Sequence, residues 1–171
     1  MEQTYKFKNK EDYLKSLDSA MPEEWFKKRE LGGGKTQKYL PIPYQEAIAD
    51  MMFSEWSIID ENYQLLVNEI VCTVKIVFTP DYPEAQEQFT TGTASKPIQM
   101  DAESKVTDFP AKKKANALEY NLPSVRKSAI GCALEGIGNI FGRNVGRKID
   151  KVHELPANFT LRKHADKEVQ E

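Results

Sequence analysis

Residues Gln64–Phe78 read QLLVNEIVCTVKIVF, a run in which the side chains alternate with a period of two. Every second residue from Leu66 onward is apolar except Asn68, whereas the intervening positions include Thr73 and Lys75. Successive side chains of a β-strand point to opposite faces, and Val, Ile and Thr are enriched in strands. The run therefore predicts one long strand that is mostly apolar on one face.

The segments around this run extend it into an antiparallel sheet. Thr79–Pro83 contains two prolines and ends the strand, and Glu87–Ser95 is expected to return beside it as the other strand of a hairpin. Trp56–Ile59, rich in aromatic and β-branched residues, is a further strand candidate. Lys96–Pro110 is polar and is predicted to be a loop.

The residues before the sheet favour short helices. Apolar residues recur at helical spacing in Lys10–Ser19, and a preceding proline suits the first turn of the helices predicted at Glu23–Arg29 and Tyr44–Phe53. Thr36–Ile42 is predicted to be a short strand. In the third helix the side chains expected to point inward are Ile48, Met51 and Met52.

The last predicted element is helical. Lys112–Tyr120 forms a first segment, and Pro123 is expected to restart the chain into a longer helix with an apolar stripe for packing on the sheet. The stripe consists of Ile130, Ala133, Leu134, Ile137, Ile140 and Phe141.

Two further patterns are expected on the same long helix. Gly138, Gly142 and Gly146 are four residues apart and predict a small-residue strip, which we assign to subunit or sheet packing rather than to direct ligand contact. Arg143 and Arg147 are expected to form an i,i+4 pair away from the apolar stripe.

Taken in order, these elements predict an α+β fold. We expect an antiparallel sheet or hairpin that packs against a long C-terminal helix, with short helices at the N-terminus. Residues 1–154 are expected to form one domain, and residues 155–171, which are polar, a flexible tail.

Composition is that of an ordinary globular protein. Of the 171 residues, 40% are hydrophobic and 29% charged, and no apolar run approaches the roughly 20 residues of a membrane span. The charged first ten residues lack the apolar region of a signal peptide, which predicts a cytoplasmic protein. Cys72 and Cys132 have apolar neighbours and are expected to be buried free thiols in a reducing cytosol.

Charge is segregated along the chain although the net charge is only −2. Residues 25–39 contain five cations and one acid, and residues 111–151 contain nine cations and three acids. The intervening residues 44–110 contain twelve acids and three cations. If folding joins the two basic segments, they form a patch that attracts phosphate backbones; the alternative is two solvated faces that never meet.

The first basic segment, residues 27–39, reads KKRELGGGKTQKY. Adjacent glycines allow positive φ and close approach of a ligand, and flanking cations suit a polyanion. Gly34-Lys35-Thr36 also resembles the end of a phosphate-binding P-loop, but Arg29 stands where that motif needs a glycine, and the preceding segment reads as a helix rather than a strand. Nucleotide hydrolysis is therefore not expected.

These residues resemble the Rad-fifty-two superfamily of single-strand DNA annealing proteins. One anchor is Arg29-x-x-Gly32-Gly33-Gly34 leading to Tyr39, followed by a helix and the turn MFSEW at residues 52–56. The other is Ala133-Leu134-x-x-x-Gly138-Asn139 in the late helix. The two anchors span residues 22–148, which is most of the chain.

The resemblance implies a DNA-binding groove and an assembly. Arg29 matches a family arginine that contacts the DNA backbone, and Tyr39 matches a tyrosine lining the same groove. The family assembles into rings or filaments and anneals strands without a nucleotide cofactor, and no catalytic or metal residue is expected. By analogy with the family, the small size suggests a phage or prophage protein in a bacterial host cell. Whether the tail from Leu155 recruits a single-strand binding protein or an exonuclease stays open. The DNA-binding candidates are Lys27, Lys28, Arg29, Lys35, Lys38, Tyr39, Arg126, Lys127, Arg143, Arg147 and Lys148.

The chain departs from the family at three positions of the late helix. Where the family has basic residues, this sequence has Gly131, Cys132 and Glu135. The charge is then expected to come from Arg126 and Lys127 before these positions, or from Arg143, Arg147 and Lys148 after them.

Several alternatives stay open at this stage. Arg29 is a DNA contact or a cation at the C-terminus of a helix, and Tyr39 is a groove residue or a half-buried strand residue. The whole protein is an annealing protein, a single-strand binding module that protects DNA without annealing it, or an oligomeric assembly protein.

Overall fold

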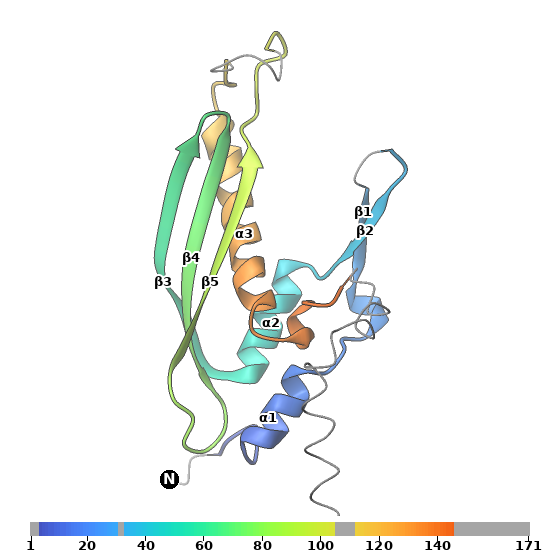
Figure 1. Ribbon diagram of the computed structural model, residues 1–171, viewed down its shortest axis with the longest axis vertical. Coiled ribbons are helices and arrows are strands. Elements are labelled where there is room, and N and C mark those ends of the chain that lie inside the picture. Colours follow the sequence, from blue (N-terminus) through green and yellow to red (C-terminus); the bar gives the residue numbers. More distant parts are fainter. Residues whose placement is uncertain (1–3, 31–32, 105–111, 146–171) are drawn as a thin grey trace, which may run out of the picture.

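The core of the molecule is a three-stranded antiparallel sheet. A computed structural model describes residues 4–30, 33–104 and 112–145. The sheet has the order β3-β4-β5, with β3 at Phe53–Leu66, β4 at Glu69–Pro80 and β5 at Gln88–Pro97 (Figure 1). The predicted α+β class with an antiparallel sheet is confirmed, as is the return strand expected at Glu87–Ser95.

The alternating pattern marks the buried face of β4 correctly, but the single long strand was wrong. Alternate residues of β4 from Ile70 to Phe78 are buried beneath the helices. The chain reverses at Val67 and Asn68, so that Leu66 pairs with Glu69. Apolar residues resume at Ile70 with the same period, and the turn contains neither glycine nor proline. The polar Asn68 was therefore interpreted as an exception within one strand rather than as part of a turn.

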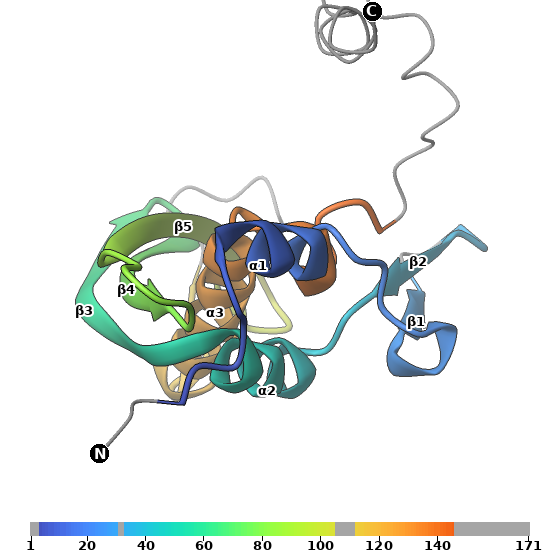
Figure 2. The same ribbon diagram turned by 90° about the horizontal axis from the view of Figure 1, so that it is seen from below.

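The long helix α3, Ala117–Glu135, packs on the sheet as predicted. It lies against β4 and β5 on the concave side of the curved sheet (Figures 1 and 2). The approach is closest at Gly92 of β5, where a Cβ atom would lie 2.2 Å from the carbonyl oxygen of Ala129. A glycine at this point therefore lets the helix backbone rest directly on the strand.

The boundaries of this helix differ from the prediction. Pro123 lies inside α3 instead of starting a new helix, and Lys112 to Asn116 precede it. An internal proline removes one helical hydrogen bond, and burial of the helix against two strands offsets that loss. The helix ends at Glu135, before the end of the chain at Glu171, so the description "C-terminal helix" was wrong.

The predicted glycine strip is also wrong. Gly138 and Gly142 lie beyond α3, on either side of the short 3-10 helix η2, Asn139–Phe141, and Gly146 lies outside the described residues. Ile137, Ile140 and Phe141 of the predicted stripe therefore lie beyond α3. Phe141 is nevertheless buried in the core. Gly142 has φ +93°, a left-handed conformation that ends η2 and turns the chain back.

Two shorter helices complete the helical layer. Helix α1, Lys10–Leu17, confirms the predicted first helix and contacts η2. Its N-cap is Asn9, whose side chain accepts a hydrogen bond from the Asp12 amide at 3.0 Å. Helix α2, Ile42–Met52, packs against α3 and buries Ile48 and Met52 as expected. Met51 is half exposed, so its inward placement was wrong.

The helix predicted at Glu23–Arg29 is wrong. Only Glu23–Trp25 forms a 3-10 turn, η1, after which Phe26 is extended. Strand β1, Lys27–Glu30, then pairs with β2, Thr36–Tyr39, in a second two-stranded sheet. This hairpin stands apart from the main sheet (Figures 1 and 2).

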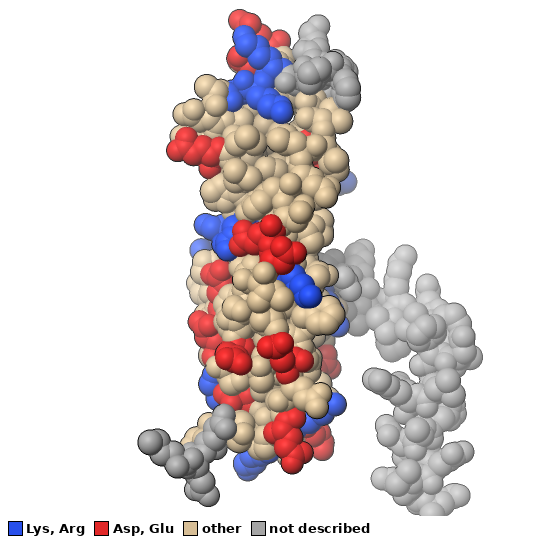
Figure 3. Space-filling view, turned by 90° about the vertical axis from the view of Figure 1, so that its left-hand side faces the viewer, with Lys and Arg blue, Asp and Glu red and all other residues tan. Residues whose placement is uncertain are grey.

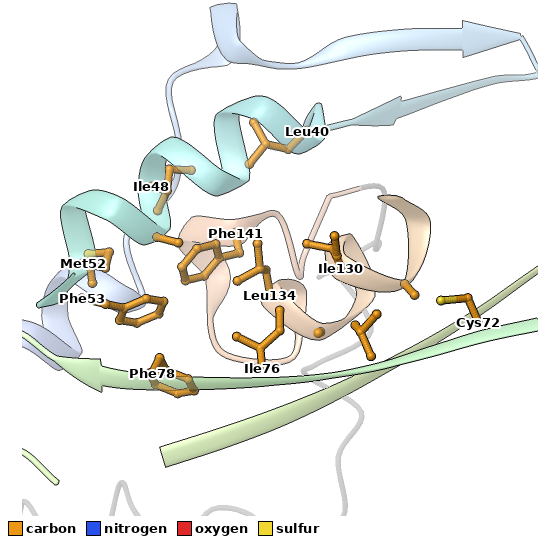
Figure 4. Packing of buried hydrophobic residues seen from close by; sticks show 14 of the residues in the cluster. Leu40, Ile48, Met52, Phe53, Cys72, Ile76, Phe78, Ile130, Leu134 and Phe141 are labelled. Atoms are coloured by element: carbon orange, nitrogen blue, oxygen red, sulfur yellow. The ribbon is translucent and has the colours of Figure 1, made fainter. Parts of the chain in front are cut away.

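The hydrophobic core lies between α2, α3 and β4 (Figure 4). The Phe53 ring is 4.5 Å from the Phe78 ring and 5.9 Å from the Phe141 ring, measured between centroids. These three aromatic residues join the start of β3, the end of β4 and the turn after α3. Ile48, Ile130 and Leu134 complete the contact from the two helices.

The cysteines differ in environment. Cys72 on β4 is buried, as predicted, whereas Cys132 on α3 is exposed, so its expected burial was wrong. In the described ranges no helix combines the length and apolar character needed to cross a membrane.

Candidate nucleic-acid interface

The glycine-rich segment forms the turn of the β1–β2 hairpin. Gly33 and Gly34 have φ values of +59° and +74°, and a Cβ atom at either would meet nothing within 4 Å. Glycine is therefore favoured here by backbone conformation rather than by crowding. The turn leads Lys35 and Thr36 into a strand, whereas a P-loop leads into a helix, so the hairpin geometry also argues against a nucleotide site.

Antiparallel pairing sorts the side chains of the hairpin into two faces. Lys27 pairs with Tyr39 and Arg29 with Gln37, which places these four residues on one face. Lys28 pairs with Lys38 on the other face. The six candidates from this segment therefore do not form one cluster, and Lys35 lies beside the turn.

Arg29 is held by its neighbours on the strand face. Its Nε and Nη2 atoms donate to Gln37 Oε1 at 3.0 and 2.6 Å, and its guanidinium lies 5.7 Å from the centre of the Tyr39 ring. These contacts fix the orientation of the guanidinium without neutralising its charge. Because Arg29 belongs to β1, the alternative role as a cation at a helix end no longer applies.

Lys38 is neutralised within the chain. Its ammonium donates to the Glu23 carboxylate and lies 4.6 Å from the centre of the Phe26 ring. Both contacts hold the hairpin against η1, so Lys38 has a structural role that Arg29 lacks.

The hairpin and α3 form the two walls of a cleft of about 490 Å³. Arg29, Gln37 and Tyr39 line it from the hairpin, and Lys127 lines it from α3. In the described part of the chain its charged lining residues are five cations and one acid: Arg29, Lys38, Lys96, Lys127, Arg143 and Glu135. Folding thus joins cations from the two basic segments of the sequence in one concave surface.

The opposite side of the molecule has a different character. Figure 3 views the molecule from the side of β3, where Asp and Glu side chains are interspersed with Lys and Arg side chains on a surface that is mostly uncharged. Glu55, Asp60 and Glu61 are the acids of β3. This side of the molecule therefore has mixed charge, in contrast to the cleft.

The α3 wall includes the three positions at which the sequence departs from the family. Gly131, Cys132 and Glu135 all line the cleft, but none supplies positive charge. A Cβ atom at Gly131 would lie 2.6 Å from Ile42 Cδ1, so this position packs against α2. The positive charge of the wall comes instead from Lys127, Lys96 and Arg143.

Arg143 lies at the end of the α3 wall and caps the helix. Its Nε donates to the carbonyl oxygen of Glu135 at 3.0 Å, and its Nη2 donates to that of Gly136. A cation at the last carbonyls of a helix is favoured by the helix dipole. Arg143 lies in a turn beyond α3, so its predicted place on the long helix was wrong. Arg147, its expected i,i+4 partner, and Lys148 lie outside the described residues.

Arg126 lies outside this cleft. Its Nε donates to Glu61 Oε1 at 2.8 Å, which joins α3 to β3. The Arg126 guanidinium, as hydrogen-bond donor, lowers the pKa of the Glu61 carboxyl below its ordinary value. Of the eleven sequence candidates, the cleft contains Arg29, Lys38, Tyr39, Lys127 and Arg143.

Sequence analysis missed three polar residues of the cleft, Lys96, Ser124 and Ser128. Lys96 is the second-last residue of β5 but was assigned to a loop. Ser124 and Ser128 are four residues apart on α3, with Lys127 between them, and this spacing was the available signal.

Cys132 is the thiol of the cleft. Desolvation, followed by the nearby Glu135 carboxylate, raises the pKa of the Cys132 thiol above its ordinary value. The thiol is therefore protonated at neutral pH, and we assign it no nucleophilic role.

Comparison with models of known protein families finds no match, and comparison with curated protein sequences finds none either. The cleft therefore has to be interpreted from its own residues.

Proposed function

We propose that the protein binds single-stranded DNA in the cleft between the hairpin and α3 and anneals complementary strands without ATP. The observation that carries the proposal is that Arg29, Lys96, Lys127 and Arg143 line one cleft, together with Lys38, which is paired with Glu23, and that Tyr39 lies beside Arg29. Cations attract phosphate oxygens whatever the base sequence, as annealing of arbitrary strands requires. The cellular setting would be homologous recombination or repair in the cytoplasm of a bacterial or phage-infected cell.

The hairpin wall supplies two complementary contacts. Arg29 keeps a charged guanidinium toward the cleft, and such a group binds a phosphate through paired donors. Tyr39 offers a ring on which a base or sugar can stack. Stacking is tolerant of sequence, so both contacts leave the pairing edges of the bases available for a second strand.

Annealing of long strands needs many such clefts in succession. We propose that the protein acts as a homo-oligomeric ring or filament, in which weak contacts at each subunit sum along the strand. The same cleft would also serve a protein that protects single strands without annealing them, so the assay has to separate binding from annealing.

The test is annealing of two complementary fluorescent oligonucleotides without ATP or metal, alongside a mass measurement of the free protein. We expect acceleration by a large oligomer. Binding without acceleration would favour the protective module. A protein that binds no single-stranded DNA would overturn the proposal and leave the assembly function.

The variant Arg29→Ala tests whether Arg29 contacts the DNA. It should weaken single-strand binding and lower the slope of log K against log salt by about 0.7, the contribution of one phosphate. Lys15→Ala is the control, because Lys15 is an exposed cation of α1 paired with Glu11 outside the cleft. Lys35→Ala should have a smaller effect than Arg29→Ala. Unchanged affinity in a folded Arg29→Ala protein would remove Arg29 from the interface.

A further inference from the structure

Four polar residues form one region of the α3 wall. Ser124, Lys127 and Ser128 occupy the face of α3 that lines the cleft, and Lys96 reaches the same region from the end of β5. Lys96 Nζ donates to Ser124 Oγ at 2.5 Å. Two ammonium groups and two hydroxyls thus lie on the wall opposite Arg29 and Tyr39.

The position of Lys96 is fixed by the packing of α3 on β5. The buried Asn121 side chain donates to the carbonyl oxygen of Pro97 at 3.0 Å and accepts from the Gln99 amide at 3.2 Å. These bonds join α3 to the chain directly after Lys96. The lysine is therefore anchored beside Ser124, one helical turn beyond Asn121.

The charge of this region is not neutralised within the described chain. Lys38 pairs with Glu23 and Arg126 with Glu61, whereas in the described ranges neither Lys96 nor Lys127 forms an ion pair with a carboxylate. Lys96 donates to a neutral hydroxyl, that of Ser124, which keeps its own O–H available to donate. The Ser128 hydroxyl instead donates to the carbonyl oxygen of Ser124 at 3.2 Å.

We propose that Lys96, Ser124 and Lys127 form a subsite for one backbone phosphate of the bound strand. This inference rests on the proposed single-strand binding and adds the site that orients the strand. The phosphate faces α3, where ammonium and hydroxyl groups bind its oxygens. The sugar or base faces Tyr39 on the hairpin. The subsite replaces charge that Gly131, Cys132 and Glu135 do not supply.

The first test measures single-strand binding of Lys96→Gln as a function of salt. We expect an affinity loss of about tenfold at low salt and a decrease of about 0.7 in the slope of log K against log salt. Lys96→Arg should retain most of the slope, because it keeps the charge. The control is Lys75→Gln, since Lys75 on the adjacent strand β4 lies over the Phe89 ring and outside the cleft.

The second test replaces alternate phosphates of the oligonucleotide with uncharged methylphosphonates. Wild-type protein should lose more affinity on this replacement than Lys96→Gln, because the variant has already lost a partner of the phosphate. Ser124→Ala should reduce the same sensitivity without changing net charge. Ser128→Ala is its matched control, because the Ser128 hydroxyl already donates to a backbone carbonyl.

The outcomes separate the subsite from the wider proposal. One outcome overturns the subsite but keeps the cleft as the DNA site. In that outcome the wild type binds the oligonucleotide and Arg29→Ala weakens this binding, but Lys96→Gln has the same salt slope and the same methylphosphonate sensitivity as the wild type. If the wild type binds no single-stranded DNA, both are overturned. Equal thermal melting of Lys96→Gln and wild type is the check that the fold is intact.

Discussion

At the scale of single residues, Gly92 is the point where the sheet and α3 come into backbone contact. A side chain there would meet the carbonyl oxygen of Ala129 at 2.2 Å and the amide nitrogen of Ala133 at 2.3 Å. Neither atom can move without displacing the helix. We expect Gly92→Ala to lower the free energy of unfolding by about 1–3 kcal/mol, measured by urea denaturation.

Gly33→Ala is the matched control for this substitution. Gly33 has open space around its Cβ position but a φ of +59°, so alanine there adds backbone strain of about 1–2 kcal/mol confined to the hairpin. The α3 contacts should remain unaffected, and hydrogen exchange of α3 amides should increase only in Gly92→Ala. Equal hydrogen exchange of the α3 amides in the two variants would contradict the close contact between Gly92 and α3.

Val67 illustrates what residue types alone do not reveal. It has φ +60° in the turn between β3 and β4, although β-branched residues rarely adopt this conformation. A sequence reader expects glycine, asparagine or aspartate at such a position. The turn was missed because its conformation is imposed by pairing of the two strands on either side, which is a property of the sheet and not of Val67.

At the scale of elements, the Glu61–Arg126 pair connects β3 to a helix that otherwise packs on β4 and β5. Hydrogen bonding from Arg126 lowers the pKa of Glu61 in the folded state below its ordinary value of 4.5. A lowered folded pKa means that the pair contributes stability above pH 4.5 and loses it as pH falls through the folded pKa.

Glu61→Gln should therefore reduce the acid sensitivity of unfolding. Because the Arg126 and Glu61 side chains are 41% and 28% exposed, the effect at pH 7 should stay below about 1 kcal/mol. Urea denaturation of wild type and variant between pH 7 and pH 3 measures it. The two stability curves should converge in acid, and a constant difference across that range would show that the pair has no pH-dependent role.

The main elements could be predicted from sequence where one face of an element is buried in the core. Alternation in β4 and the apolar residues of α3 around Ile130 and Leu134 correctly indicated a strand and a helix that pack together. Strand β1 was misread as part of a helix at Glu23–Arg29 because it has no buried residue to give it a period, whereas β2 lies within the strand predicted at Thr36–Ile42. The pairing of β1 depends on the glycine turn and on β2.

The candidate site was predictable in part for the same reason. Arg29, Tyr39 and Lys127 were identified from charge and motif, and the structure places all three in one cleft. Lys96 was not identified, because its proximity to Ser124 depends on how α3 lies across β5. A contact between residues distant in sequence leaves no local signal.

At the scale of the whole molecule, the distal half of β3 is an uncovered surface. Residues 59–66 are all exposed, and Ile59, Leu65 and Leu66 are each more than half exposed. The strand forms one edge of the sheet, and such an edge readily pairs with another chain unless it is protected. We expect subunits of the proposed assembly to contact one another through this surface.

A charge on this surface should reduce the mass of the assembly. We expect Leu66→Lys to shift the protein toward smaller species in light scattering, because a buried ammonium between subunits is costly. Leu14→Lys is the control, since Leu14 on α1 is exposed to a similar extent at 48%. If Leu66→Lys keeps the wild-type mass while Leu14→Lys reduces it, the contact lies at α1 instead.

The attachment of the hairpin has a consequence for how DNA would enter. Both β1 and β2 join the rest of the chain at the same end, so the cleft between the hairpin and α3 has one wall that is free at its tip. A strand can then be laid into the cleft sideways rather than threaded from a terminus. A covalently closed single-stranded circle should consequently be as good a ligand as a linear strand of the same length.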